Sequence, residues 1–575
     1  MTALLRIGNC SGFYGDRLSA MREMLEGGPL DVLTGDYLAE LTMLILGKDT
    51  MKDPSLGYAR TFVRQAEDCL GLALERDVKI VSNAGGLNPA GLAERLREVA
   101  QGLGLDPSIA HVEGDDLRAR AGDLGLDGPL TANAYLGGFG IAAALDAGAD
   151  VVVTGRVTDA SLVVGPAVAH FGWRPTAYDE LAGAVVAGHI LECGTQATGG
   201  NFSGFADLPD LDRPLGFPLA EIAADGSSVV TKHPGTGGLV TLDTVTAQLV
   251  YEIQSNHYLG PDVTTHLDSI ELSDDGPDRV RVSGVRGSAP PEQLKVCVNE
   301  LGGWRNSVEL VLTGLDIGAK AAWVRTQLTR ALGDTPPATV HWSSVPDRIL
   351  DASTEEGASA LLRCTVLDPS PDVVGKRFTA AAVELALGSY PGFTMTAPPS
   401  PPTPYGVYRP AYVDRSAVTH EVVLADGRRV PVGDPPELSA PDDGTAGLRP
   451  SPYPAPTDTI TRRVPLGSFV HARSGDKGGD ANLGLWVVHD GSPAYDDRVT
   501  WLAKLINPRK VRELIPEAAD LDVEVHVLPN LGAVNVLIRG LLGEGVAAST
   551  RFDPQAKGLG EWVRSRLVNI EGTLL

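Results

Sequence analysis

The sequence of 575 residues lacks the features of several large protein classes. It contains no run of about 18 uncharged apolar residues, so we expect no membrane-spanning helix. The first residues include no long apolar stretch and no cleavage signature, so we do not expect export. The formal net charge is −25, no basic patch interrupts it, and such a charge repels nucleic acid and anionic membrane surfaces. We therefore predict a cytoplasmic protein that binds neither nucleic acid nor membrane.

Cysteine is also scarce. The five cysteines are odd in number, widely spaced and free of any Cys-x-x-Cys pair: Cys10, Cys69, Cys193, Cys297 and Cys364. This pattern indicates reduced thiols rather than a disulfide framework or a zinc site. The spacings typical of a P-loop, a nucleophile elbow, a His-Glu-x-x-His zinc site and an EF-hand are absent too. We predict no metal site.

The composition that remains is that of an ordinary globular protein. Hydrophobic residues make up 43% and charged residues 21%, and the length exceeds that of one ordinary core, so we expect two or more domains. The first two hundred residues repeat a short apolar run, a break rich in Gly, Asp or Asn, and a helical segment, as in VKIVSNAGGLNP and ADVVVTGRVTDASL. Buried strands that alternate with helices predict an α/β domain with a mainly parallel, doubly wound sheet.

Changes in composition divide the chain. Strands and helices continue to about residue 395, so we predict a core domain over 1–395, either as one body or as two lobes, 1–240 and 241–395. Two proline-rich tracts predict a connecting region over 396–460, because their composition favours extended chain. Residues 461–575 have the pattern of two strands, a helix, two strands and a closing helix, which predicts a small α+β sandwich.

Polar residues follow each predicted strand of the core domain. Ligands of open α/β sheets bind beyond the carboxyl ends of the strands, where helix N-termini point their amides inward. The same residue types also cap helices, so each residue alone has a capping interpretation. Because five such loops share one edge, we predict that they line one site: Asn9, Cys10, Ser11, Asp16, Thr34, Gly35, Asp36, Asn83, Gly85, Gly86, Asn88, Glu113, Asp115, Asp116, Arg156, Thr158 and Asp159.

The segment GHILECGTQATGGNFSGF, residues 188–205, is rich in glycine and polar groups. His189 precedes Cys193 by four residues, so in a helix both would share a face and His189 could activate Cys193 as a thiolate nucleophile. A small buried cysteine is the alternative interpretation. Glycines let the backbone approach a ligand. We therefore add to the predicted site Gly199, Gly200 and Asn201.

A second segment, HARSGDKGGDAN, places ionisable residues around three glycines at 471–482. Amides freed by the glycines, with Arg473 and Lys477 beside them, suit a phosphate or a carboxylate. A charged, solvated hairpin turn would use the same residues. The candidate ligand-binding residues are His471, Arg473, Asp476, Lys477 and Asn482.

Several of these segments together resemble one family. RIGNCSGFYGDR, DVLTGDYLAELTM, SNAGGLNP, ADVVVTGRVTDASL, GHILECGTQATGGNFSGF and HARSGDKGGDANLGLWV are similar to the acyclic terpene utilisation AtuA family over essentially the whole chain. The resemblance implies a large N-terminal α/β domain and a C-terminal ferredoxin-fold-like domain that begins at the RSGDKG segment. Members occur with the degradation of acyclic terpenes and branched acids as coenzyme A thioesters, so a coenzyme A thioester is implied as substrate or ligand.

Three functional hypotheses follow. The first is a catabolic enzyme that acts on a branched or terpenoid acyl-CoA or hydroxy acid by acid/base chemistry of the hydratase or lyase type. The second is a non-catalytic acyl-CoA-binding partner of an acyl-CoA carboxylase, and the third is a thioester hydrolase that uses Cys193. We expect a homo-oligomer, because homo-oligomers are common among such enzymes.

For the first hypothesis we predict a base at Asp36 or Asp159 and a clamp for the carboxylate or thioester at Arg156. The amides around Asn201 would stabilise an oxyanion. The predicted catalytic residues are Asp36, Arg156, Asp159, His189, Cys193 and Asn201.

Overall fold

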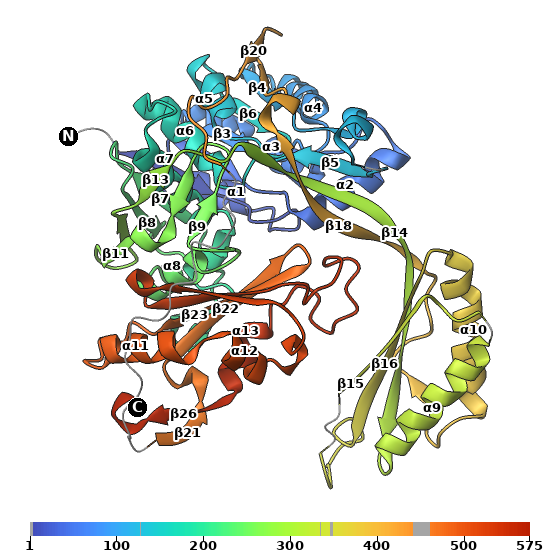
Figure 1. Ribbon diagram of the computed structural model, residues 1–575. Helices are drawn as coiled ribbons and strands as arrows, with labels where there is room; N and C mark the ends of the chain where they lie inside the picture. Colours follow the sequence, from blue (N-terminus) through green and yellow to red (C-terminus); the bar gives the residue numbers. More distant parts are fainter. Residues whose placement is uncertain (1–3, 127, 334, 346–348, 441–460) are drawn as a thin grey trace. The chain divides into compact units, whose positions relative to one another are not determined.

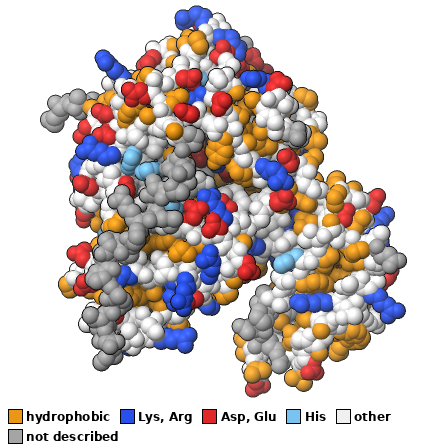
Figure 2. Space-filling view, in the orientation of Figure 1, with side chains coloured by type: hydrophobic (Ala, Val, Ile, Leu, Met, Phe, Trp, Pro, Cys, Tyr) orange, Lys and Arg blue, Asp and Glu red, His pale blue; other side chains and the backbone are white. Residues whose placement is uncertain are grey.

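A computed structural model describes residues 4–126, 128–333, 335–345, 349–440 and 461–575 (Figure 1). The chain divides into two compact units. The main unit comprises 1–299, 408–546 and 555–575, and the inserted unit comprises 300–407 and 547–554. Within the described residues, no helix combines the length and the apolar character needed to cross a membrane. On the face drawn in Figure 2, Lys and Arg side chains are interspersed with Asp and Glu.

The main unit is built on an 11-stranded sheet, counted over the described residues. Its centre is parallel and has the order β1 (Leu5–Asn9), β2 (Val32–Gly35), β3 (Lys79–Ser82), β6 (Val151–Thr154) and β4 (Ile109–Glu113). Antiparallel strands extend the β1 edge in the order β7 (Pro218–Ile222), β8 (Ser228–Lys232), β12 (Val280–Ser283) and β11 (Glu271–Asp274). The β4 edge is extended by β19 (Glu421–Val423) and β20 (Arg429–Pro431).

The sheet is therefore mixed, and the prediction of a mainly parallel sheet holds only for its centre. The reason is the connection between strands: β7 and β8, and β11 and β12, are joined by short loops, which can link only antiparallel neighbours. The crossover helices that make strands parallel are confined to the first part of the chain. The α/β character of the domain is confirmed.

Helices cover both faces of the central strands (Figure 1). One face packs against α1 (Ala20–Gly27), α3 (Arg60–Glu75) and α4 (Pro89–Leu103). The other packs against α5 (Phe139–Asp146), α6 (Ser161–Phe171), α7 (Tyr178–Leu191) and α8 (Leu242–Leu249). In β6, Val151 and Val153 belong to the first core and Val152 to the second, so these three successive positions all need apolar residues.

The inserted unit contains a second sheet. Strand β14 (Gln293–Thr313) pairs at its start with β5 (Thr131–Ala134) and continues into this unit. There it is followed by α9 (Ile317–Leu332), β15 (Thr339–Val345), β16 (Ser359–Asp368), α10 (Phe378–Val383) and β17 (Thr394–Met395). The strand order β15-β16-β14-β17 and the chain order βαββαβ are those of a ferredoxin-like unit.

The predicted connecting region 396–460 is partly folded. Its described part, 396–440, contributes β18 (Thr403–Asp414), which pairs with β14, and the edge strands β19 and β20. Pro404 and Pro410 in β18 are exposed, and proline is tolerated on a strand whose amides are not all needed for pairing. Residues 441–460 lie outside the described residues. The domain boundaries themselves stay a prediction.

The C-terminal part of the main unit has the predicted order of two strands, helix, two strands and helix. Its antiparallel sheet runs β22 (Val470–Lys477), β23 (Asp480–Val487), β25 (Ala533–Ile538) and β24 (Val523–Leu528). The helices are α11 (Tyr495–Leu505), α12 (Pro508–Leu514) and α13 (Leu559–Ser565), and β21 (Thr461–Pro465) pairs with β26 (Leu567–Glu571). Residues 471–482 are mostly strand, with the turn confined to Gly478 and Gly479.

Candidate functional site

The carboxyl ends of β2, β3 and β6 bring four predicted residues together. The Asn83 side-chain amide donates to the Asp36 carboxylate over 2.6 Å. Arg156 Nη1 lies 2.9 Å from Asp159 Oδ1 and donates to the Leu38 carbonyl over 3.0 Å. The charges of Asp159 and Arg156 both act on Asp36. The prediction that these loops meet at one sheet edge is therefore supported by their contacts.

Burial changes the pKa of both carboxyl groups, Asp36 and Asp159. It raises the pKa of Asp36 well above its usual range, and the Asp159 charge adds to this rise while Arg156 opposes it. Burial also raises the pKa of Asp159 to about 7, against the lowering effect of Arg156. Two neighbouring carboxyl groups in such surroundings titrate as a pair and share a proton more easily than they both ionise. Asp159 keeps 23% of its side chain exposed, whereas Asp36 is 5% exposed, so Asp159 is the group that a substrate can reach.

A histidine–carboxylate pair ends α7 beside these groups. Nδ1 of His189 lies 3.0 Å from Glu192 Oε1. Burial would lower the pKa of His189, but the Glu192 charge and hydrogen bond outweigh it and raise the pKa. The Asn9 side chain donates to the Leu191 and Glu192 carbonyls over 2.6 and 3.3 Å, so it holds the end of the helix. We predicted no role for Glu192; its spacing of three residues from His189 on a helix is the signal that indicates such a pair.

Cys193 directly follows this pair, but its surroundings oppose a thiolate. Burial raises the pKa of Cys193 well above its usual value, and the charges of Glu252 and Glu192 raise it further. Within the described part of the chain, no hydrogen bond joins His189 to Cys193: Nδ1 of the imidazole is paired with Glu192, and Nε2 has no partner. The thiol is therefore protonated at neutral pH, unlike the nucleophile that the spacing of His189 and Cys193 suggested.

Strand β22 of the C-terminal domain contributes Arg473 to the site. Nη1 of Arg473 donates to the carbonyls of Gly200 and Asn201 over 3.1 and 2.8 Å. Its guanidinium stacks over the Tyr251 ring, 4.6 Å from the ring centre. The predicted segments around 200 and 473 thus meet, but the 200 segment offers carbonyl oxygens to Arg473.

A residue of the neighbouring strand β23, Asn482, positions a further acid, Glu252. The Asn482 side chain accepts from the Glu252 amide over 2.8 Å and donates to the Ile253 carbonyl over 3.2 Å. Glu252 has a left-handed backbone with φ of 56°. Its carboxylate lies 3.9 Å from the ammonium group of Lys557 and acts electrostatically on Asp159 and Cys193. Asn482 therefore positions Glu252, and its own side chain is fully used.

Two further residues of the glycine-rich segment face charged groups. Burial raises the pKa of Asp476 to about 7, the Glu252 charge adds to this and the Lys557 charge opposes it. The Lys477 charge acts on Glu40, the first residue of α2 (Glu40–Lys52), and on Lys295. Glu40 and Lys295 come from strands and helices far apart in sequence, and no motif signals that they meet.

Other predicted residues have local structural partners. The Ser11 hydroxyl donates to the Phe13 carbonyl, and a side chain at Gly85 would collide with the Thr154 carbonyl. Gly86 has a φ of 54°, which favours glycine. The Gly199 and Gly200 amides donate to the Gln196 and Thr195 carbonyls, so they are not available as oxyanion donors.

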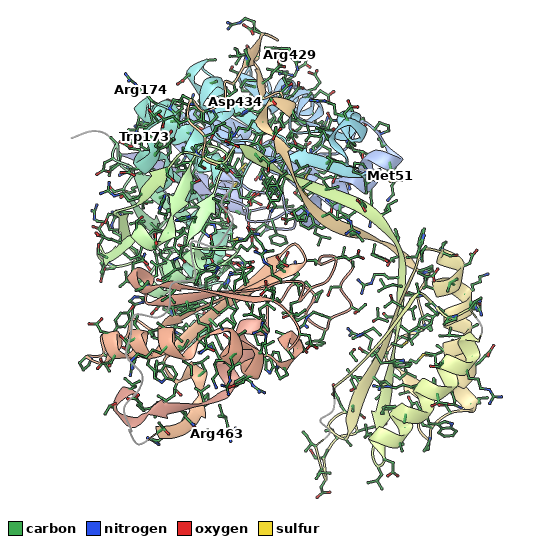
Figure 3. All side chains as sticks on the ribbon, viewed as in Figure 1. Met51, Trp173, Arg174, Arg429, Asp434 and Arg463 are labelled. Carbon is green, nitrogen blue, oxygen red and sulfur yellow. The ribbon has the colours of Figure 1, made fainter. Side chains whose placement is uncertain are left out.

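Two more predictions lie away from the carboxyl pair. The His471 ring packs between Phe202 and Trp486, at 5.2 and 5.6 Å between ring centres. Glu113 pairs over 2.5 Å with Arg429 of β20, which lies at the outer edge of the sheet (Figure 3). Both residues therefore contribute to packing or to the edge of the sheet rather than to the cluster.

Six buried polar atoms at this place have no hydrogen-bond partner among the residues that the structure describes. Buried polar atoms of folded proteins are nearly always hydrogen-bonded, so their concentration indicates where a bound molecule completes the bonding. Asp159 Oδ1 is close to Arg156, but the two are not aligned for a hydrogen bond. The atoms are Arg156 Nε, Asp159 Oδ1, His189 Nε2, Glu192 Oε2, Gln196 Oε1 and Arg473 Nη2. In the described ranges, no group of three or more His, Cys, Asp or Glu could hold a metal ion.

Two family models match the chain. The model of the acyclic terpene utilisation family protein AtuA covers residues 5–424. The chain belongs to the AtuA family. The model of the AtuA ferredoxin-like domain covers residues 464–569, which confirms the resemblance in both parts of the sequence. A comparison with curated proteins gives no match.

The cluster of the AtuA-family protein draws on both matched regions. Asp36, Arg156, Asp159 and Glu252 lie in the first, and Arg473 lies in the second. The family description connects the chain with the utilisation of acyclic terpenes.

Proposed function

We propose that this AtuA-family protein is a catabolic enzyme of acyclic terpene or branched-acid degradation that acts on a branched or terpenoid acyl-CoA or hydroxy acid. The chemistry is acid/base chemistry of the hydratase or lyase type. The observation that supports it is the carboxyl pair of Asp36 and Asp159 beside Arg156. Acid/base catalysis needs groups of opposed protonation close to one carbon centre at the working pH. The carboxyl pair meets this need, because burial raises the pKa of Asp159 to about 7 and that of Asp36 well above its usual range.

The roles follow from access and charge. Asp159 is the base, because it is the more exposed carboxyl. His189 is the acid, since its pairing with Glu192 favours the protonated ring and its Nε2 is unpartnered. Arg156 supplies positive charge to the thioester oxygen as that oxygen becomes enolate-like.

The same two groups serve both reaction types. In hydration, Asp159 takes a proton from water while the water oxygen bonds to the β-carbon, and His189 protonates the α-carbon. In cleavage, Asp159 takes the proton of a β-hydroxyl, the bond between the α- and β-carbons breaks, and His189 protonates the enolate. Protons and electrons balance in each direction without a further reactant.

A panel of branched and terpenoid enoyl-CoAs and 3-hydroxyacyl-CoAs tests the proposal. Each is incubated with the purified full-length protein, and products are followed by mass spectrometry. We expect at least one substrate to gain or lose water or to split into a smaller acyl-CoA and a carbonyl compound. Absence of turnover on the whole panel, together with growth on acyclic terpenes supported by an Asp159→Asn variant, would count against the enzyme.

The thioester hydrolase hypothesis makes a separate prediction at Cys193. Because burial and two carboxylates hold the pKa of this thiol high, Cys193→Ala should keep the turnover rate within about a factor of two. Consumption of the active thioester, followed by mass spectrometry, measures the turnover rate, and a thiol reagent measures free coenzyme A, which only the hydrolase would release. Loss of coenzyme A release in both Cys193→Ala and Cys193→Ser would instead favour the hydrolase.

A non-catalytic acyl-CoA carrier for an acyl-CoA carboxylase is the other candidate. One observation favours it: among the described residues, Lys477 has no hydrogen-bond or ion-pair partner for its ammonium group, which is free to meet a phosphate. Co-purification with a carboxylase, and coenzyme A affinity that depends on Lys477 but not on Asp159, would support this alternative.

A further inference from the structure

Arg473 is a buried cation with no counterion. The residue is 4% exposed, and in the part of the chain that the structure describes no carboxylate forms an ion pair with it. Its Nη1 group donates to two neutral carbonyls, those of Gly200 and Asn201. Its Nη2 group is buried and has no partner. The positive charge is thus held at the site and left partly unsatisfied.

Such an arrangement is costly for a folded protein. Burying a charge is unfavourable unless an opposite charge and hydrogen bonds compensate for the lost water. The charge of the Glu252 carboxylate acts on Arg473, but this carboxylate also lies 3.9 Å from the Lys557 ammonium. The neutral stack on Tyr251 supplies a cation–π contact, which is weaker than an ion pair. An anion from outside the chain would compensate the buried positive charge of Arg473.

The guanidinium group of Arg473 lies in the same cluster as the carboxyl pair of Asp36 and Asp159. Cys193 and Glu252 each interact with Arg473, and Glu252 and Glu192 act on both Cys193 and Asp159. These shared neighbours are the reason to assign an anion on Arg473 and a reacting carbon at Asp159 to one bound molecule. This step rests on the function proposed above.

We infer that Arg473 binds a carboxylate of the substrate that is separate from the reacting thioester, so that the substrates are coenzyme A thioesters of dicarboxylic acids. Two features favour a carboxylate over a phosphate. Only one amino group of Arg473 remains free, which suits a small monoanion. A phosphate carries more charge, and its burial next to Glu252 would cost more.

Binding to matched thioesters tests the inference. Dissociation constants of the full-length protein are measured by calorimetry for malonyl-, succinyl- and glutaryl-CoA. Each is compared with the thioester of equal chain length without the second carboxylate, namely propionyl-, butyryl- and pentanoyl-CoA. We expect at least one dicarboxylic thioester to bind roughly tenfold more tightly than its partner, as for a charged hydrogen bond.

Two variants complete the test. Arg473→Gln should remove the preference, and Arg473→Lys should keep part of it. Arg415→Gln is the matched control: Arg415 is also buried, but Pro291 and Pro261 carbonyls occupy its donors. This control should keep the full preference, provided that circular dichroism shows all three variants folded.

The outcomes separate the two proposals. If the wild-type protein has no preference in any pair, the inference is wrong even if Arg473→Gln cannot be folded. If Arg473→Gln weakens both thioesters of each pair equally, Arg473 binds a coenzyme A phosphate, which also overturns it. A preference that depends on Arg473 without turnover supports the carboxylate site and contradicts the acid/base enzyme. Turnover without a preference for the dicarboxylic thioesters supports the acid/base enzyme and contradicts the carboxylate site.

Discussion

Replacing Asp159 by asparagine is expected to lower kcat by about 10²- to 10⁴-fold, the usual contribution of a general base. Asparagine has nearly the same shape but cannot accept a proton. The wild-type rate should rise with pH through about 7, since burial raises the pKa of Asp159 to that value and only the ionised carboxylate acts as the base. The variant should lose this rise. Rates measured from pH 5 to 9 on an active substrate from the panel give both readouts.

Asp262→Asn serves as the control for this prediction. Burial raises the pKa of Asp262 to about 6, but its carboxylate accepts from the Gly138 amide at the start of α5, outside the charged cluster. The control should keep the wild-type rate and pH profile. Equal losses in the two variants would indicate a general effect of replacing a buried acid and would remove the support for Asp159 as the base.

Replacing Trp486 by alanine should lower the free energy of unfolding by about 3–5 kcal/mol, as for other large side chains removed from a core. The side chain is fully buried with 0% exposure, and its indole nitrogen donates to Asp243 of α8 over 2.9 Å. It joins the core of the N-terminal sheet although it belongs to β23. The substitution therefore weakens the attachment of the C-terminal domain as well as the core.

Urea unfolding followed by fluorescence and circular dichroism measures this effect. Trp323→Ala in α9 is the control, because Trp323 is 48% exposed and its loss should change stability by less than about 0.5 kcal/mol. A loss of stability at Trp486 no larger than at Trp323 would show that the domain contact contributes little to the folded state.

The sequence predicted the centre of the fold better than its edges. Runs such as the three valines 151–153 must be apolar at each position because both faces are covered, and this pattern is visible without a structure. The same sheet edge then gathers Asp36, Asn83 and Asp159, as expected from parallel strands. The antiparallel edges escaped prediction because the partners of their strands are chosen by tertiary packing.

The charged cluster was predictable only in part. Glu252 lies in a left-handed turn, and Glu40 and Lys295 come from separate elements, so no local spacing connects them with Asp159. The segment 471–482 was expected to form a hairpin turn because of its glycines, but it keeps the turn only at Gly478 and Gly479. It forms strands because its neighbours alternate on two covered faces, as Gly475 against Tyr251 and Ser474 against Gly560 show.

The dispersal of the cluster along the chain affects the order in which it forms during synthesis. Asp36 and Asp159 leave the ribosome before Arg473 and Lys557, which lie several hundred residues further along the chain. A nascent protein can close its central sheet and still lack the cations that face Glu252. The charges of the cluster are therefore all assembled only after Lys557 has been made, and a product that stops before Arg473 would expose its acids unbalanced.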